Sequence, residues 1–337
     1  MRQAGDRRTG IRHPDPTPEV PAGMNPCGAN IAPTMTLTRQ QAVLLVILTL
    51  VWGFNWPILK MGVLGYPPLT FRSLSMWLGL PFLGLVLYLR RVPFTVPRGQ
   101  WRELLVLATT NMFVWHVLII FMVQALSSGR SAILGYTMPI FSAVIGVLWF
   151  SAKMQRRGWI GILAATGGVV LLLWHEFTTL SGRPLGVVMG LVGAAFWGLG
   201  TQQIRQTRMT VPTLTIVFWM TAMTTLLMSA LAWIFERPQW DAPPALTWMA
   251  IVYNAFGVFV FAQATWLSLA RNLPPLASTL SVMFIPVLGV FSGAVLLQEP
   301  LYWQDWTAIV LIVVAIASVL WPSSPSPASP TQAKAPA

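Results

Sequence analysis

The stretch QAVLLVILTLVWGFNWPILKMG, residues 41–62, decides the fold of this chain. A helix needs about 20 apolar residues to cross a bilayer core of roughly 30 Å, and this stretch is long enough to do so. Comparable apolar stretches follow one another as far as Trp321, and 55% of the 337 residues are hydrophobic while only 9% are charged. A soluble domain carries roughly a quarter charged residues. With a mean hydropathy of +0.66, the chain is expected to lie in a membrane.

The apolar stretches are expected to be helices. Lipid offers the backbone no hydrogen-bond partner, so only helices and closed barrels cross it, and barrel strands alternate polar with apolar residues, which these stretches do not. Charged residues and Pro/Gly clusters bound ten of them, at 41–62, 69–89, 104–126, 131–151, 158–174, 185–204, 212–235, 246–269, 275–297 and 304–321. The prediction is therefore an all-α membrane protein with ten transmembrane helices.

The two ends of the chain are polar and of low complexity. Residues 1–38 are rich in Pro, Gly and Arg, and residues 322–337 in Pro, Ser and Ala, so both are predicted to be disordered tails. The first tail has no apolar segment typical of a signal peptide, and Met24 or Met35 are alternative starts to Met1. The single cysteine, Cys27, excludes an intrachain disulfide.

The distribution of Lys and Arg predicts the orientation of the spans. With a cytoplasmic N-terminus, sixteen basic residues fall on the cytoplasmic side, namely Arg2, Arg7, Arg8, Arg12, Arg39, Arg90, Arg91, Arg98, Arg102, Lys153, Arg156, Arg157, Arg205, Arg208, Arg271 and Lys334. The opposite side receives only Arg130, Arg183 and Arg237. The positive-inside rule therefore predicts that both termini are cytoplasmic. Because the net charge of +12 is spread thinly over short loops, it does not indicate a nucleic-acid partner.

The two halves of the chain resemble each other. A shift of 147 residues places Trp101 on Trp248, Trp159 on Trp306, Trp174 on Trp321 and Pro139 on Pro286, and a shift of 145 places Trp52-Gly53 on Trp197-Gly198. The repeats are predicted at 39–174 and 185–321. Each holds five spans, an odd number, so the second must be inverted relative to the first. Such inverted repeats are common in secondary transporters, whose substrate site lies between them.

Matched polar residues predict where that site lies. His116 falls on Gln263 under the shift of 147, and both lie near the middle of their spans, so they are expected to face each other across a central cavity. The alternative is a histidine hydrogen bonded between helices. Pro139 and Pro286 are expected to interrupt their helices at matched points. The predicted substrate-binding residues are His116, Gln263, Asn55, Trp56, Asn111, Tyr136, Trp266 and Ser278.

Two basic residues in or near spans have two interpretations. Lys60 and Arg72 could each pair with a substrate carboxylate or extend toward lipid headgroups. No Asp or Glu lies in the middle of a span, so coupling to protons would use His116 or a group at a helix end such as Glu299, and facilitated diffusion or exchange remains open.

The order of these motifs resembles the EamA family of the drug/metabolite transporter superfamily. The resemblance covers residues 41–321 and rests on Trp52, Gly53, Lys60, Arg72, Ala125, Leu126 and Pro139, and on LLQEPL at 296–301, which is similar to a Leu-x-Glu-x-Leu signature. In the first repeat Ala152 replaces the Glu of that signature. The resemblance implies a multi-pass transporter of the inner (plasma) membrane that exports amino acids or other small metabolites, and the branch that exports aromatic amino acids is the one indicated.

Other classes of function were weighed against export. A multispan enzyme would need a cluster of His, Asp, Glu or Cys near one interface, and the sequence has neither that nor a nucleotide-binding loop, so the chain is expected not to be an enzyme and to need no cofactor or metal. An exporter of other metabolites or of drugs, and a channel-like facilitator, are the alternatives. The expected partners are a small-molecule substrate and membrane lipid, and the oligomeric state is left open.

Overall fold

The computed structural model describes residues 39–151, 156–178, 183–263, 265 and 275–320, all of which belong to one unit of the chain, Leu37–Ala337. Within these ranges the structure is helical and contains no strand, which confirms the all-α prediction. The predicted tails at 1–38 and 322–337 lie outside them.

The elements are α1 (Arg39–Gly65), α2 (Pro68–Leu89), η1 (Arg98–Gln100), α3 (Trp101–Leu107), η2 (Ala108–Phe113), α4 (Val114–Ala125), α5 (Ser128–Gly135), α6 (Met138–Phe150), α7 (Arg156–Thr178), α8 (Pro184–Gln206), α9 (Thr213–Glu236), η3 (Arg237–Gln239), α10 (Ala245–Val252), η4 (Tyr253–Ala262), α12 (Pro275–Leu297) and α13 (Trp303–Leu320).

Most of these elements combine into apolar segments of membrane-spanning length. In the part of the chain that the structure describes, seven segments are long and apolar enough to cross a bilayer: Arg39–Gly65, Pro68–Leu89, Arg98–Ala125, Ser128–Phe150, Pro184–Gln206, Thr213–Gln239 and Ala245–Ala262. Three shorter apolar helices accompany them, at Gly158–Leu172, Phe284–Leu297 and Trp303–Ser318. Each of the ten overlaps one of the stretches predicted from the sequence. The chain is a multi-pass membrane protein.

Large apolar side chains on the surface agree with a lipid environment. Leu163 is 73% exposed, and Trp149 and Trp174 are 69% and 66% exposed. In water each such side chain would lose the roughly 1.5–3 kcal/mol that its burial provides. In a bilayer the same surface faces hydrocarbon or, for Trp, the headgroup region, so its exposure carries no such penalty.

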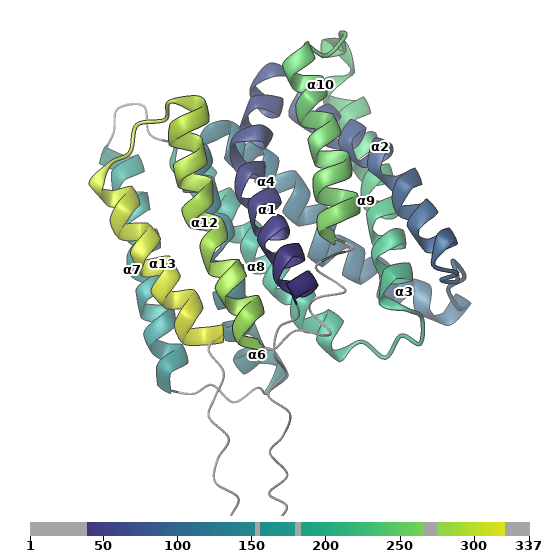
Figure 1. The fold of residues 1–337 in the computed structure, drawn as a ribbon, viewed down its shortest axis with the longest axis horizontal. Coiled ribbons are helices and arrows are strands. Elements are labelled where there is room, and N and C mark those ends of the chain that lie inside the picture. The colour runs from purple at the N-terminus through teal and green to yellow at the C-terminus, as the bar shows by residue number, and fades with distance from the viewer. Residues whose placement is uncertain (1–38, 152–155, 179–182, 264, 266–274, 321–337) are drawn as a thin grey trace, which may run out of the picture. The chain divides into compact units, whose positions relative to one another are not determined.

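The helices of the two halves pack in matched pairs. Helix α1 packs against α12 and against α10 with η4, while its counterpart α8 packs against α6 and α4. Helix α2 contacts η4, and its counterpart α9 contacts η2. The counterparts α2 and α9 also contact each other, as do α7 and α13, which lie side by side in Figure 1. Every contact of this set therefore has its equivalent in the other half of the chain.

Matched glycines bring two of these helix pairs close together. A Cβ on Gly53 of α1 would lie 2.6 Å from the Cβ of Leu288 on α12, so only glycine fits there. A Cβ on Gly198 of α8 would lie 2.7 Å from the backbone nitrogen of Ser142 and 3.1 Å from Phe141, both on α6. The shift of 145 residues relates the two glycines, and the shift of 147 relates Phe141 to Leu288. Small residues at helix crossings are the usual means of close packing in membranes.

The matched prolines do not have matched effects. In the first half the helix ends at Gly135 and starts again at Met138, so the predicted interruption near Pro139 is found. In the second half α12 runs through Pro286 as one helix, so there the proline removes one hydrogen bond from the ladder without ending the helix. The side chains before each proline explain the difference. The hydroxyl of Thr137 donates to the Leu134 carbonyl at 2.6 Å and stabilises the turn, whereas the equivalent residue, Phe284, has no hydroxyl.

Candidate functional site

Two π-helical segments occupy equivalent places in the two halves. The six residues of η2 lie in the third span, and the shift of 147 residues places them at 255–260, inside η4 of the eighth span. A π-turn re-aims the side chains around it, and such turns are frequent at functional sites. Here they carry Asn111 and Asn254, which are both buried. No Pro or Gly occurs in ATTNMF at 108–113, so the π-helical distortion of η2 could not be predicted from its residue types.

Four aromatic side chains, three from the first half and one from the second, meet in the core, and they are referred to below as the aromatic cluster: Trp56, Trp115, Tyr136 and Trp197. The rings of Trp56 and Tyr136 have their centroids 6.4 Å apart, and those of Trp115 and Trp197 lie 5.4 Å apart. Gly135 lies between the two pairs and allows one ring of each to approach its backbone. A Cβ at this position would lie 2.6 Å from Cη2 of Trp56 and 3.4 Å from Cη2 of Trp115. Two of the predicted site residues, Trp56 and Tyr136, are thus in contact.

A second buried group, referred to below as the Arg72 cluster, consists of Arg72, His116, Asn254 and Phe259. Nη1 of Arg72 donates to Oδ1 of Asn254 at 3.1 Å, and the guanidinium lies 5.6 Å from the centroid of the Phe259 ring. The His116 ring packs edge-on against the same phenylalanine, with centroids 5.5 Å apart. All four residues are at most 7% exposed: 2%, 6%, 0% and 1% respectively. Trp115 and His116 are consecutive on α4, so one residue of each cluster comes from the same turn of that helix.

Several polar atoms in this region are buried without a hydrogen-bond partner. Among the described residues they include Nε of Arg72, both ring nitrogens of His116 and Oδ1 of Asn55. Such a group costs about 1–3 kcal/mol when it is left unpaired. The sequence-based alternative of a histidine bonded to a neighbouring helix is not what the structure contains. A polar ligand bound here would satisfy these atoms.

The remaining predicted residues lie around these clusters. Gln263 is half-buried directly after η4, one helical turn beyond Phe259, which is the residue that the ring of His116 contacts. Nδ2 of Asn111 donates to the Trp197 carbonyl at 3.4 Å, next to the aromatic cluster. Trp266 and the side chain of Ser278 lie outside the described residues.

Lys60 has neither of the roles considered from the sequence. Its Nζ donates to the carbonyls of Val123, Gln124 and Leu126 at 2.8, 3.0 and 2.7 Å. These are carbonyls at the C-terminal end of α4, which lack helical partners and carry the negative end of the helix dipole. All three donors of the ammonium group are thereby used, so Lys60 caps a neighbouring helix.

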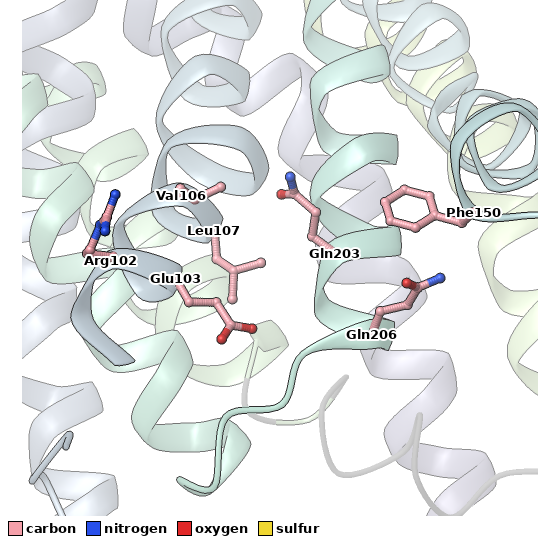
Figure 2. A pocket seen from close by; sticks show the side chains of 7 residues that line it. All are labelled: Arg102, Glu103, Val106, Leu107, Phe150, Gln203 and Gln206. Atoms are coloured by element: carbon pink, nitrogen blue, oxygen red, sulfur yellow. The ribbon is translucent and has the colours of Figure 1, made fainter. Parts of the chain in front are cut away.

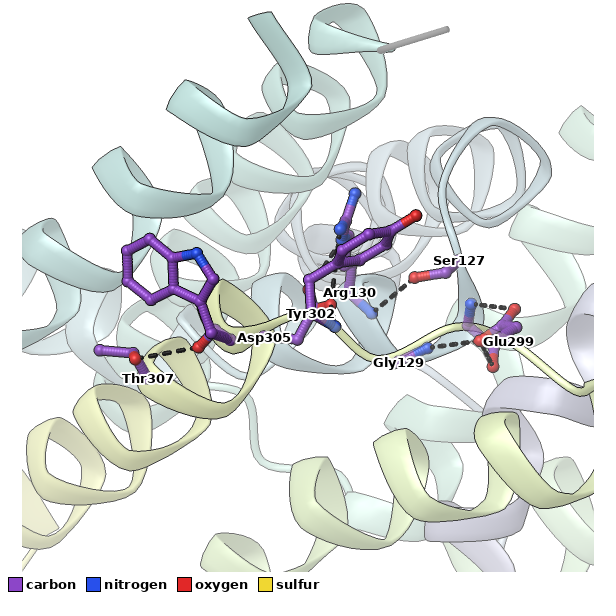
Figure 3. A network of polar contacts seen from close by, with 9 residues as sticks. Ser127, Gly129, Arg130, Glu299, Tyr302, Asp305 and Thr307 are labelled. Carbon is purple, nitrogen blue, oxygen red and sulfur yellow. Dashed lines mark hydrogen bonds and ion pairs between the residues drawn. The ribbon is translucent and has the colours of Figure 1, made fainter. Parts of the chain in front are cut away.

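One end of the bundle, the acidic end, carries Glu236, Asp241, Glu299 and Asp305. Figure 3 shows the network around Glu299, whose carboxylate accepts from the backbone nitrogens of Ser128 and Gly129 at 2.7 and 3.3 Å and from the Ser128 hydroxyl at 2.8 Å. Nearby, Nε of Arg130 forms an ion pair with Asp305 at 2.7 Å. Glu299, which is the Glu of the stretch LLQEPL at 296–301, therefore caps the N-terminus of α5 and fixes the loop after α12 to that helix.

A second carboxylate at the acidic end does the same for α2. Glu236, at the end of α9, accepts from the backbone nitrogens of Leu69 and Thr70 at 2.9 and 2.7 Å and from the Thr70 hydroxyl at 2.7 Å. The Tyr66 hydroxyl donates to the Asp241 carbonyl oxygen at 2.8 Å, and burial, followed by the charges of Asp241 and Glu236, raises the pKa of Tyr66. The acidic end is therefore held together by side chains from both halves.

The opposite end, the basic end, carries Arg90, Arg98, Arg102 and Arg205, and it contains a pocket of about 410 Å³. Figure 2 shows side chains of α3 on one side of this pocket and of α8 on the other, and its lining is formed by Arg102, Glu103, Val106, Leu107, Phe150, Gln203 and Gln206. Gln203 accepts a hydrogen bond from Thr110 at 2.7 Å, and the next residue, Asn111, reaches the aromatic cluster through Trp197. Polar side chains thus lead from the pocket toward the core.

The chemistry of the site is that of binding. Among the described residues no three His, Cys, Asp or Glu side chains gather in a way that could hold a metal ion. What the core offers is a cation, an imidazole, carboxamides and flat aromatic surfaces, all of which bind small molecules without covalent chemistry. Arg72 was not among the predicted substrate-binding residues, although pairing with a substrate carboxylate was one of the two interpretations considered for it. Its position near the start of a span allowed a lipid-facing role, and its partner Asn254 is 182 residues away in the chain.

Comparison with known proteins gives a consistent result. The model of the EamA-like transporter family matches residues 40–174 and again residues 184–321. An uncharacterized transporter of Bacillus subtilis, YoaV, is 23% identical over 261 residues, which are 76% of this chain and 88% of that protein. An uncharacterized inner membrane transporter of Escherichia coli K12, YedA, is 26% identical over 295 residues, covering 83% and 92%.

Two further similarities concern a named activity and a solved structure. A protein of Salmonella typhimurium named a probable amino-acid metabolite efflux pump is 23% identical over 289 residues, covering 83% of this chain and 94% of that protein. A solved crystal structure superposes with a TM-score of 0.60 at 18% identity, over 84% of this chain and 98% of the other. The latter shows a shared fold.

Proposed function

Because the chain belongs to the EamA-like transporter family, we propose that it is a secondary transporter that exports amino acids, preferentially those with aromatic or apolar side chains. In this proposal ten spans form two inverted repeats, and the substrate crosses by alternating access through the core between them. The seven long and three shorter apolar helices and the matched helix pairs support this architecture. The protein is not an enzyme in this account, and it needs no cofactor.

The observation that carries the substrate class is the aromatic cluster beside unpaired polar atoms. Trp56, Trp115 and Tyr136 offer flat apolar surface, while Asn55 and His116 have buried polar atoms without partners. Amino acids combine the two features, since they have a polar head and, in the aromatic ones, a flat side chain that stacks on other rings. The name of the Salmonella relative, a probable amino-acid metabolite efflux pump, favours the same class.

In this proposal the substrate enters through the pocket at the basic end. We place the basic end in the cytoplasm, in line with the distribution of Lys and Arg, so that both termini are cytoplasmic, and the name of the Escherichia coli relative favours the inner membrane. The pocket then opens toward the cytoplasm, and Arg102, Glu103 and two carboxamides at its mouth would meet the charged groups of an amino acid. The aromatic cluster lies further along the same route.

Uptake into proteoliposomes tests this proposal. Purified protein is expected to give saturable uptake of phenylalanine, tryptophan or leucine from a panel of amino acids, with aromatic ones preferred. The same panel contains other metabolites and drugs, so saturable flux of one of those alone would favour an exporter of a different class. If no compound gives saturable flux, the chain is not a transporter of this kind, and a linear, non-saturating flux would indicate a channel-like facilitator.

A further inference from the structure

We infer that the Arg72 cluster is a carboxylate-binding subsite, in which Arg72 receives the carboxylate of the transported molecule and His116, which packs against the same Phe259 ring, donates a hydrogen bond to that carboxylate. The inference deepens the proposed function and rests on it for the identity of the substrate, but the existence of the subsite is tested separately below.

The first step is the burial of a cation without a counter-ion. Arg72 is 2% exposed, and in the described part of the chain it forms no ion pair. The carboxylate of Glu236, near the start of the same helix, is hydrogen bonded to Leu69 and Thr70 instead. A guanidinium removed from water without an anionic partner is strongly unfavourable, so buried charges are normally paired or bind a ligand.

The second step is the geometry of the group. The guanidinium is a planar fork whose N–H groups bind the two oxygens of a carboxylate side by side. Asn254 holds Nη1 at 3.1 Å, and Asn254 is itself fixed because its Nδ2 donates to the Ala250 carbonyl at 3.0 Å. Nε of Arg72 has no partner in the described structure. One edge of the fork is therefore fixed, and the Nε side remains available to an anion.

The third step is what lies next to the cation. Phe259 contacts both Arg72 and His116, and both ring nitrogens of His116 are unpaired among the described residues. One of these nitrogens carries a proton even in the neutral ring, so it can donate to a carboxylate oxygen. His116 follows Trp115 directly on α4. In this inference the side chain of a molecule with its carboxylate at Arg72 extends toward the aromatic cluster, to which the same turn of α4 contributes Trp115.

Thermal stability in detergent tests the subsite without requiring transport. The probes are phenylalanine, 3-phenylpropanoate, which lacks the ammonium group, and phenethylamine, which lacks the carboxylate. The wild-type melting temperature is expected to rise with the first two and not with the third. In Arg72→Gln the rise should disappear, because the loss of a charged hydrogen-bonding partner weakens binding by about tenfold to a hundredfold. Arg130→Gln, which removes a partly buried arginine from the acidic end, is the matched control and should keep the response.

A conservative variant guards against misfolding of Arg72→Gln. Arg72→Lys keeps the charge and loses the fork, so it should retain the preference for carboxylates over phenethylamine with a raised half-saturating concentration. The inference is overturned if neither carboxylate stabilises the wild type, or if Arg72→Gln or Arg72→Lys responds as the wild type does. A carboxylate-dependent rise together with no saturable amino-acid flux would keep the subsite and refute the proposed function. Saturable amino-acid flux in the wild type, together with a stabilisation by phenylalanine that is the same in Arg72→Gln as in the wild type, would do the reverse.

Discussion

Gly135 stands where the rings of Trp56 and Trp115 approach the backbone. A methyl group at this position would lie 2.6 Å from the first ring and 3.4 Å from the second. The neighbouring Tyr136 belongs to the same cluster, so the absence of one side chain lets three aromatic residues from different helices meet. At this scale the site depends on a close approach that the sequence alone does not reveal.

The substitution Gly135→Ala tests this dependence. We expect it to lower the free energy of unfolding by about 1–3 kcal/mol, because the added methyl group overpacks a buried site. Uptake of aromatic amino acids should fall more than uptake of small ones, since the rings are displaced. Unfolding in a graded detergent mixture gives the stability. Gly99→Ala is the control, since a Cβ there meets nothing within 4 Å, and an equal loss in both variants would contradict the account.

At the scale of elements, the helix termini of the acidic end are fixed by carboxylates from other helices. Glu299 caps α5 and Glu236 caps α2, and in each case the carboxylate accepts two backbone N–H groups and one hydroxyl. The four first N–H groups of a helix lack partners within the helix, so a carboxylate placed there is favourable both as an acceptor and as a charge. The signature residue Glu299 is thus explained as a connection between elements.

The substitution Glu299→Gln should weaken this connection. A neutral amide keeps one acceptor oxygen and loses the charge, so we expect a loss of about 1–2 kcal/mol in the free energy of unfolding. Hydrogen exchange at the amides of Ser128 and Gly129 should become faster, which a distant effect would not cause. The exposed Asp241→Asn is the control and should change stability by less than about 0.5 kcal/mol. Unchanged exchange at those two amides would refute the capping role.

The elements themselves were largely predictable, and their irregularities were not. Long apolar runs such as 41–62 and 212–235 are bounded by charges or prolines, so the helices α1 and α9 follow directly from the pattern. The helix is interrupted before Pro139, where Thr137 bonds the Leu134 carbonyl, whereas α12 is continuous through Pro286, where the equivalent residue is Phe284. The π-helical segment η2 has no Pro or Gly that would reveal it from the sequence.

Two aromatic residues of the candidate site were among those predicted from the sequence, and its buried cation was not. Trp56 and Tyr136 were proposed from the sequence and are in contact. Arg72 and Lys60 had the same two interpretations, yet the first is buried against Asn254 and Phe259 and the second caps α4. Which of these occurs depends on partners more than sixty residues away in the chain, and such contacts leave no trace in local composition.

At the scale of the whole molecule, the proposed orientation is testable by chemical labelling. In a Cys27→Ser background, Asp241→Cys places a thiol at the acidic end and Gly99→Cys places one at the basic end, and both positions are exposed. In intact cells a membrane-impermeant maleimide should react with Asp241→Cys alone. After permeabilisation both should react. Reaction of Gly99→Cys in intact cells would contradict the placement of the basic end in the cytoplasm.

The helix contacts that are equivalent in the two halves are relevant to alternating access. Contacts such as α1 with α12 and α8 with α6 are equivalent in the two halves, so a rearrangement that opens one end of an inverted pair has a counterpart that opens the other. The acidic end is held by Glu236, Glu299 and the Arg130–Asp305 ion pair. Pockets of about 320 and 410 Å³ lie at the acidic and the basic end respectively. Alternating access requires that each end opens in turn.

Counterflow tests the central claim, that the chain is a carrier of amino acids, most directly. Proteoliposomes loaded with unlabelled phenylalanine are diluted into a trace of labelled phenylalanine, and the internal label is followed with time. A carrier that alternates between two faces exchanges one molecule for another, so the account predicts a transient accumulation of label above its final level. A steady approach to equilibrium that is the same with and without internal phenylalanine would contradict it.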